Sequence, residues 1–288
     1  MAINTAEEHK QKGNTFFSNG DYQDAITEYT NAIIKDSSNP VYYTNRSLCY
    51  YRLNKYEETK NDAQHAIELD KSSLKGHYYL GLALTKMGRL NQADVNLARA
   101  YELSLAQHSK SSPHISEAIL QLRKMKWEQD ERQRLRDAQP LLAELIDLLE
   151  EKKAASAAEF AKQRDDGSLS PEEYKDEISF LDSDTQRKIK ELKATFDHAA
   201  NVSSSETGAP LNPKPVPEYL LDPISFNLFV DPVITKSGQS YERSWILEHL
   251  RSSKTDPFSR EHLTEQDLIP NLAIKAAAEQ YIESQGTY

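Results

Sequence analysis

The chain has one cysteine, 9 glycines and 2 tryptophans among its 288 residues. Cys49 has no partner for an internal disulfide, and no second thiolate is present for a structural zinc site. No run of 18 apolar residues occurs, which argues against a membrane-spanning helix, and the start, MAINTAEEHKQKGN, lacks the apolar core of a secretory signal. We therefore expect a cytoplasmic protein, with the nucleus as a second compartment, and neither a metal nor a cofactor.

Basic residues are also in short supply, with 35 Lys and Arg against 45 Asp and Glu and a net charge of -10. Nucleic-acid-binding proteins usually present a basic face, so this balance argues against nucleic acid as a partner. Residues 1–127 carry 16 basic and 14 acidic side chains. Only this part of the chain favours an acidic ligand.

A repeat of 34 residues organises the first third of the chain. Small residues stand at Gly13, Ser47 and Gly81, and the same interval relates four further sets: Phe16, Tyr50 and Leu84; Ala25, Thr59 and Ala93; Tyr29, Ala63 and Leu97; Ala32, Ala66 and Ala100. A helix-turn-helix unit of this length resembles the tetratricopeptide repeat. We predict repeats over 6–39, 40–73 and 74–107 in a domain 1–112; the alternative is a helical bundle with accidental spacing.

Turns of the right kind separate the two helices expected in each repeat. Asn19-Gly20, Asn54 and Gly88 lie between the two helical stretches of the first, second and third repeats. Glycine and asparagine tolerate the left-handed backbone that ends many helices.

Long helices are predicted for the middle region, 113–200. Residues 115–138 and 140–162 are rich in strong helix formers, and Ser170-Pro171 resembles a helix start. Two apolar stripes at helical spacing favour a helical hairpin. The first consists of Leu142, Leu145, Ile146 and Leu149, and the second of Ile189, Leu192 and Phe196. The first stripe needs a partner to cover it, which is the repeat domain, the following helix or a second chain. Residues 201–216 form a Ser- and Pro-rich linker, with an SH3-type ligand as the alternative.

The last segment, 217–288, reads as a small α+β module. A strand over 233–235, a Ser237-Gly238 turn, a second strand, a helix near 242–252 and a final helix near 270–284 are expected. The order and spacing of several short motifs resemble the U-box family, a RING-like fold held by polar side chains in place of zinc: Asp222-Pro223-Ile224, Asp231-Pro232-Val233, Gly238, Tyr241-Glu242-Arg243, Asp256-Pro257-Phe258 and Leu268-Ile269-Pro270-Asn271.

The order of modules resembles the CHIP-type co-chaperone ubiquitin ligases. This resemblance implies a mainly α fold: a three-repeat solenoid, a helical hairpin and an α+β U-box. It implies binding to the acidic tails of heat-shock protein 70 and 90 chaperones, to a ubiquitin-conjugating enzyme with ubiquitin, and to misfolded clients destined for the proteasome. A homodimer is expected. The alternatives are a non-catalytic adaptor with a vestigial U-box, and a ligase for another acidic-tailed partner.

The resemblance also implies a carboxylate clamp for the tail. Lys10, Asn14, Asn45 and Lys75 match its register, and ammonium and amide donors on a rigid scaffold suit a terminal Asp with its two carboxylates. Many co-chaperone clamps have an arginine where Tyr79 stands here. An apolar pocket for the upstream tail residue is expected from Leu48, Tyr79 and Ile115, with helix packing as the alternative role.

The U-box carries no nucleophile and no acid–base constellation, so the implied mechanism is proximity to a conjugating enzyme. Docking is assigned by resemblance to Ile224, Phe226 and Pro257, and Arg260 to holding the donor ubiquitin in its reactive state. The alternatives are core positions for Ile224 and Phe226 and a structural ion pair for Arg260. We interpret His249 as helix packing or loop support rather than as a catalyst or metal ligand.

Overall fold

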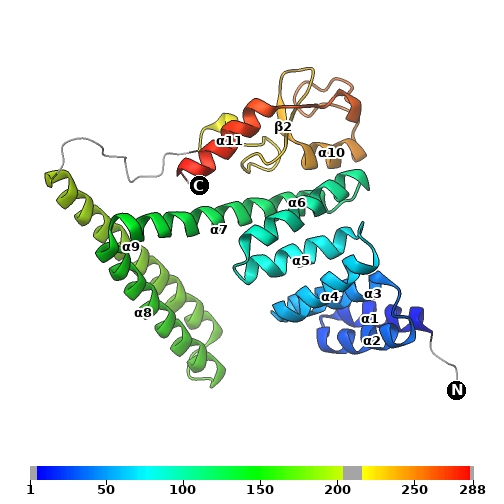
Figure 1. Cartoon of the computed structure of the whole chain (residues 1–288), viewed down its shortest axis with the longest axis horizontal. Coiled ribbons are helices and arrows are strands. Elements are labelled where there is room, and N and C mark those ends of the chain that lie inside the picture. The colour runs from blue at the N-terminus through cyan, green and yellow to red at the C-terminus, as the bar shows by residue number, and fades with distance from the viewer. Residues whose placement is uncertain (1–4, 204–215, 286–288) are drawn as a thin grey trace. The chain divides into compact units, whose positions relative to one another are not determined.

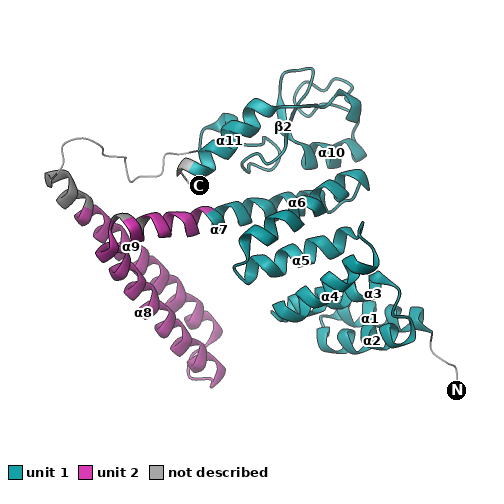
Figure 2. Ribbon diagram, viewed as in Figure 1, with its two compact units in different colours: residues 1–126, 216–287 teal, residues 127–215, 288 magenta. Residues whose placement is uncertain are grey.

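The computed structural model describes residues 5–203 and 216–285 and divides into two compact units (Figure 2). Of the described residues, 5–126 and 216–285 belong to unit 1 and 127–203 to unit 2. Most of the predicted linker, residues 204–215, lies outside the described residues.

Three helical hairpins form the N-terminal part of unit 1 (Figure 1). The first helices of the hairpins begin at residues 6, 40 and 74, and the second helices at 22, 56 and 90, so both series keep the interval of 34. This confirms the predicted tetratricopeptide solenoid. The six helices are α1 (Ala6–Asn19), α2 (Tyr22–Lys35), α3 (Pro40–Arg52), α4 (Tyr56–Leu69), α5 (Leu74–Lys86) and α6 (Leu90–Ala106).

The helix ends repeat as well as the helices. Each first helix begins with a capping residue whose side chain accepts a backbone N–H of the first turn. The three capping residues are Thr5, Asn39 and Ser73, again 34 residues apart. The turns inside the hairpins contain a residue with positive φ in every repeat, at Gly20 (87°), Asn54 (57°) and Gly88 (73°). Local sequence therefore sets the start and the turn of every hairpin.

Small residues allow the two helices of a hairpin to approach closely. A Cβ atom added to Gly13 would lie 2.7 Å from the Tyr29 ring, and one added to Gly81 would lie 2.7 Å from the Leu97 side chain. Both distances are too short for a real contact, so glycine is required there. The alanines at the other repeat positions are fully buried, namely Ala25, Ala32, Ala63, Ala66, Ala93 and Ala100.

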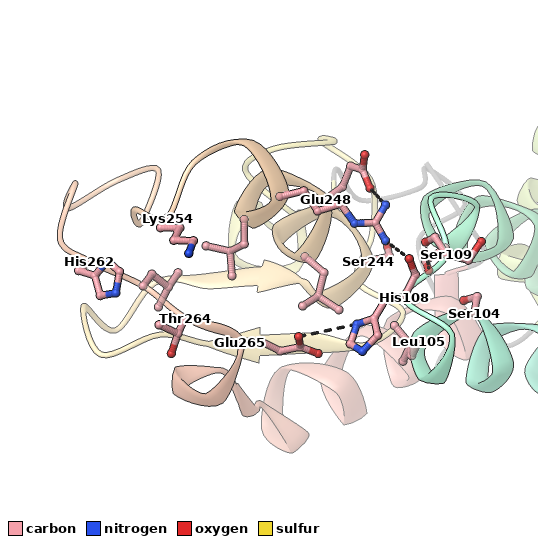
Figure 3. A pocket seen from close by; sticks show the side chains of 15 residues that line it. Ser104, Leu105, His108, Ser109, Ser244, Glu248, Lys254, His262, Thr264 and Glu265 are labelled. Atoms are coloured by element: carbon pink, nitrogen blue, oxygen red, sulfur yellow. Dashed lines mark hydrogen bonds and ion pairs between the residues drawn. The ribbon is translucent and has the colours of Figure 1, made fainter.

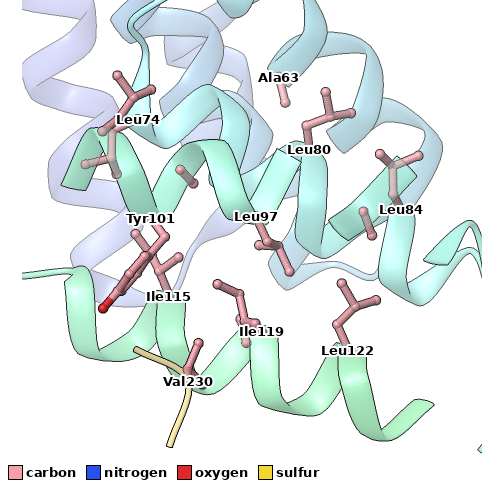
Figure 4. Packing of buried hydrophobic residues seen from close by; sticks show 14 of the residues in the cluster. Ala63, Leu74, Leu80, Leu84, Leu97, Tyr101, Ile115, Ile119, Leu122 and Val230 are labelled. Carbon is pink, nitrogen blue, oxygen red and sulfur yellow. The ribbon is translucent and has the colours of Figure 1, made fainter. Parts of the chain in front are cut away.

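The solenoid core continues into α7 (Ser112–Ala138). Ile115 and Leu122 are fully buried and Ile119 nearly so, in one cluster with Leu97 and Tyr101 of α6 (Figure 4). The first part of α7 thus completes the last repeat by covering its apolar face. Unit 1 accordingly includes the chain up to residue 126.

The C-terminal module is a small sheet with helices. Its antiparallel sheet has the order β2-β1-β3, with Val233 opposite Tyr241 on one side and Pro270 on the other. The predicted strands and helices are present, and the short third strand was not predicted. The elements are η1 (Glu218–Leu220), β1 (Pro232–Ile234), β2 (Ser240–Glu242), α10 (Arg243–Ser252), η2 (Glu265–Asp267), β3 (Ile269–Pro270) and α11 (Leu272–Gln285).

Unit 2 contains the predicted helical hairpin, in which α8 (Pro140–Asp165) packs against α9 (Pro171–Ser203). Pro140 is the first residue of α8, where its missing N–H has no helical partner to lose. Ser170 and Glu173 form reciprocal hydrogen bonds at the start of α9. Leu142 and Ile146 of the predicted stripe are buried. Among the residues that the structure describes, no helix is both long and apolar enough to cross a membrane.

Candidate functional site

The predicted clamp residues lie on the first helices of the repeats, and two of them touch. The Asn14 Oδ1 atom of α1 accepts hydrogen bonds from the Tyr29 hydroxyl at 2.8 Å and from Asn45 Nδ2 of α3 at 3.4 Å. Two amide side chains from neighbouring repeats thereby meet at one place. Tyr29 is buried in the repeat core, so its hydroxyl fixes the orientation of the Asn14 amide.

The two clamp lysines are in different states. Lys10, one helical turn before Asn14, forms an ion pair with Glu7 at 2.6 Å, and the Glu7 side chain is 53% exposed. Lys75 is exposed at the first turn of α5 and has no ion pair within residues 5–203 and 216–285. An exposed ion pair contributes little stability, so Lys10 can exchange Glu7 for a ligand carboxylate at small cost.

The three residues proposed for the apolar pocket divide into two kinds. Tyr79 and Leu48 are half-buried, and Tyr79 occupies the repeat position of Asn45. Burial raises the pKa of the Tyr79 phenol to about 12, so it stays neutral. Ile115 is fully buried in the solenoid core. The packing role therefore describes Ile115, because α7 turns this side chain into the core and leaves no surface for a ligand.

Arg52 is not among the residues predicted for the clamp. It is exposed in the last turn of α3, seven residues after Asn45 and so near the same helix face. Burial raises the pKa of Tyr78 and of Tyr79, and the positive charge of Arg52 opposes both rises. The seven-residue spacing from Asn45 is the signal that could have identified it.

Two similar loops form the exposed end of the U-box module. One has the sequence Asp222-Pro-Ile-Ser-Phe226 and the other Asp256-Pro-Phe-Ser-Arg260. In both loops the fifth residue donates its N–H to the aspartate carbonyl, at 2.8 and 2.9 Å, and has a positive φ, 57° and 62°. The loops thus repeat one backbone conformation, a likeness already visible in their sequences.

Each loop is held by a buried aspartate carboxylate. Asp222 accepts the N–H groups of Ser225 at 2.7 Å and of Glu242 at 2.9 Å. Asp256 accepts the N–H of Phe258 at 2.8 Å and the hydroxyl of Tyr241 at 2.8 Å. Because Tyr241 and Glu242 are consecutive residues of β2, one strand anchors both loops. Further donors to Asp256 are Thr235, Ser237 and Ser259.

The pKa values of two carboxyl groups beneath the loops, those of Asp256 and Glu242, are shifted in opposite directions. Burial alone raises the pKa of Asp256, but its hydrogen bonds outweigh burial and lower the pKa to about 2. Burial raises the pKa of Glu242 to about 7, although the N–H groups of Val230 and Asp231 donate to it at 2.8 and 3.0 Å. The Asp256 carboxylate, which anchors the second loop, is therefore ionised at neutral pH.

The residues assigned to enzyme docking lie on these two loops. Phe226 is 72% exposed, Pro257 and Arg260 are exposed, and Ile224 is half-buried against the module core. Phe226 is therefore not a core residue. The Arg260 side chain forms no ion pair within the described part of the chain, so the structural ion pair considered for it is absent there. Phe258, 75% exposed, adds to the same apolar surface.

The support role of His249 is visible in the geometry. Its Nε2 atom lies 3.0 Å from the Thr255 carbonyl oxygen, at the entrance to the second loop. Within residues 5–203 and 216–285, no cluster of three or more His, Cys, Asp or Glu side chains could hold a metal ion. In this module hydrogen bonds to Asp222 and Asp256 hold the loops.

These features define the class of protein: tetratricopeptide repeats combined with a U-box. Family models agree, matching a U-box domain over residues 216–287, a TPR repeat over 13–54 and a tetratricopeptide repeat over 41–73. The chain is 34% identical to the E3 ubiquitin-protein ligase CHIP of Arabidopsis thaliana over 284 residues, covering 98% of this chain and 95% of that protein. The chain belongs to the CHIP family of E3 ubiquitin-protein ligases.

Other relatives match only the repeats. Heat shock protein STI1 of Saccharomyces cerevisiae is 41% identical over 100 residues, which is 34% of this chain and 17% of that protein. A solved structure of the second TPR of Spaghetti (RPAP3) bound to an HSP90 peptide is 37% identical and covers 34% of this chain and 92% of that one, with a TM-score of 0.34.

Replacing Asp256 by asparagine should destabilise the U-box by about 2–3 kcal/mol, because several donors lose their ionised acceptor. Hydrogen exchange of residues 217–285 in urea measures this effect in the full chain. Glu261→Gln, an exposed change in the same segment, is the control and should have no effect. Equal protection in wild type and Asp256→Asn would contradict the anchoring role.

The same carboxylate predicts an acid dependence. Its pKa is about 2 in the folded protein and ~3.9 in an unfolded chain, so its stabilising contribution is complete above pH ~4 and is lost as the pH falls toward 2. The Asp256→Asn variant should lack this part of the acid-induced loss of U-box stability. Identical acid profiles for the two proteins would count against the assignment.

Proposed function

We propose that this protein is a U-box ubiquitin-protein ligase and co-chaperone that captures the acidic tails of heat-shock protein 70 and 90 chaperones. It directs ubiquitin from a conjugating enzyme onto the misfolded client that the chaperone holds, for degradation by the proteasome. The observation that carries the proposal is the union, in one chain, of a lysine and asparagine set on the repeats with an exposed apolar docking surface on the U-box. Membership of the CHIP family supports it.

Tail capture follows from the chemistry of the repeat face. Asn14 and Asn45 offer amide donors at one place, and Lys10 and Lys75 supply two ammonium groups. A chain that ends in aspartate carries two carboxylates, and charge-assisted hydrogen bonds to both are stronger than neutral ones. Arg52 adds a third cation for the acidic residues upstream.

Ubiquitin transfer needs no catalytic residue on this chain. The amine of a client lysine attacks the thioester carbonyl of the charged conjugating enzyme; an isopeptide bond forms and the enzyme thiol leaves. The U-box contributes by docking the enzyme through Ile224, Phe226 and Pro257 beside the tail-held chaperone, which raises the local concentration of client lysines. Arg260 restrains the donor ubiquitin.

We also propose that the protein forms a homodimer and acts in the cytoplasm, where chaperone-held clients meet the ubiquitin system. Exposed apolar side chains support the dimer. Leu141 and Leu148 of α8 are 60% and 55% exposed and stand two helical turns apart, and Phe180 of α9 is 68% exposed. The U-box exposes Tyr219, Ile269 and Leu272.

Lys10→Ala should weaken binding of a synthetic peptide ending in Glu-Glu-Val-Asp at least tenfold, because a charge-assisted hydrogen bond of about 1.5–3 kcal/mol is lost. Isothermal titration with the full-length protein measures it. Lys35→Ala, an exposed lysine on α2, is the matched control. Unchanged affinity of the Lys10 variant would remove the clamp from the proposal.

Phe226→Ala should reduce discharge of ubiquitin from a charged conjugating enzyme at least tenfold, because an anchor of the docking surface is lost. Peptide affinity should not change. Ile34→Ala, which truncates a side chain 73% exposed on α2, controls for loss of surface apolar area. If the wild-type protein discharges none of a panel of conjugating enzymes, the non-catalytic adaptor is the correct function.

Leu148→Glu should convert a dimer of about 66 kDa, twice the chain mass of 32.8 kDa, into a monomer, since a carboxylate cannot be buried unpaired in an apolar interface. Sedimentation equilibrium measures the mass. Lys152→Glu places the same side chain at an exposed polar position of α8 and should leave the dimer intact. A monomeric wild type would contradict the dimer.

A further inference from the structure

The repeat domain reaches the docking surface of the U-box within unit 1. The loop between α6 and α7, residues 107–111, lies against α10, where the Arg251 guanidinium donates to the His108 carbonyl oxygen and the His108 ring lies 3.8 Å from the Glu265 carboxylate (Figure 3). A pocket of about 300 Å³ lies between this loop and the U-box. The loop thus contacts the U-box through both the backbone carbonyl and the side chain of His108.

The contacts behind the loop fix the two modules together. Val230 of the U-box belongs to the solenoid core cluster and is 5% exposed (Figure 4). The Tyr101 hydroxyl donates to Glu242 at 3.4 Å, and the Ser116 and Ser244 hydroxyls lie 3.2 Å apart. Because these groups are buried and hydrogen-bonded, the loop keeps its place beside the U-box.

The loop is also ordered within itself. The N–H of Ser109 donates to the Ser104 carbonyl at 2.8 Å, the N–H of Ser111 donates to Ser109 Oγ at 3.1 Å, and the Ser112 hydroxyl donates to the Ser109 carbonyl at 2.9 Å. Lys110 is therefore presented from a defined backbone.

Lys110 lines a groove that is continuous with the docking surface. The groove has a volume of about 480 Å³ and is bordered by Ile224, Trp245 and His249, of which Ile224 is a docking residue. The other charges at the groove are satisfied, since Arg251 pairs with Glu248. Lys110 is exposed and has no carboxylate within ion-pair distance in the described ranges. It is an unneutralised cation at the edge of an apolar surface.

We propose that Lys110 extends the docking surface for the conjugating enzyme and favours enzymes that carry a carboxylate beside their apolar docking loop. The repeat domain then takes part in choosing the enzyme as well as holding the chaperone. This inference rests on the ligase function proposed above. A charge at the rim of an interface acts mainly on encounter rate and salt dependence, which sets the expected signature.

The test is ubiquitin discharge by the full-length protein from a panel of purified, ubiquitin-charged conjugating enzymes. With the most active enzyme, Lys110→Glu should raise the half-saturating enzyme concentration about three- to tenfold at low salt and leave the maximal rate unchanged. The difference should shrink at high salt, because screening weakens exposed charge pairs. Lys35→Glu makes the same charge change on α2 and should have no effect.

A reciprocal change identifies the partner charge. Replacing one by one the acidic residues beside the enzyme's docking loop by lysine should restore half-saturation with Lys110→Glu at a single position. Unchanged half-saturation for Lys110→Glu would overturn the inference, and so would a lower value, which would mean that the loop obstructs docking. Absence of discharge by the wild type overturns the ligase function itself, so the two failures are distinguishable.

Discussion

Two buried aspartates hold the loops on which the action of the U-box depends. Asp222 and Asp256 each accept several N–H and O–H groups, and both are tied to neighbouring residues of β2. Their hydrogen bonds keep Phe226 and Arg260 in a left-handed backbone that a free loop would rarely adopt. Exposed apolar side chains make few contacts that could hold a loop in one conformation. The positions of the docking residues therefore depend on the buried polar contacts beneath them.

In the repeats, regular helix packing positions the predicted clamp residues. Small residues at fixed positions bring the helices together, and caps and turns recur with the same interval. This regular packing places the Asn14 amide of one repeat beside the Asn45 amide of the next. A preorganised set of donors loses little entropy when it binds a flexible tail, which suits capture of a short peptide terminus.

Much of the fold could be predicted from the sequence because its signals are local. Short sequence patterns predict the repeat interval of 34 residues, the turn at Gly88 and the start of α9 at Pro171. Ile115 could not be assigned, since a residue of a lone helix gives no sign of which face the last repeat covers. The contact of Tyr101 with Glu242 joins residues 141 apart in the chain, and no local pattern encodes it. The place of Lys110 beside the U-box likewise depends on a contact between distant parts of the chain, that of Arg251 with His108.

In the proposed function, tail capture and ubiquitin transfer act on one target. Reconstituted ubiquitination of a client bound to a heat-shock protein 70 chaperone, with free Glu-Glu-Val-Asp peptide as competitor, tests this coupling. Saturating peptide should suppress ubiquitination of the client while self-ubiquitination of the ligase continues. Client ubiquitination that is indifferent to the peptide, with the chaperone still present, would contradict this coupling.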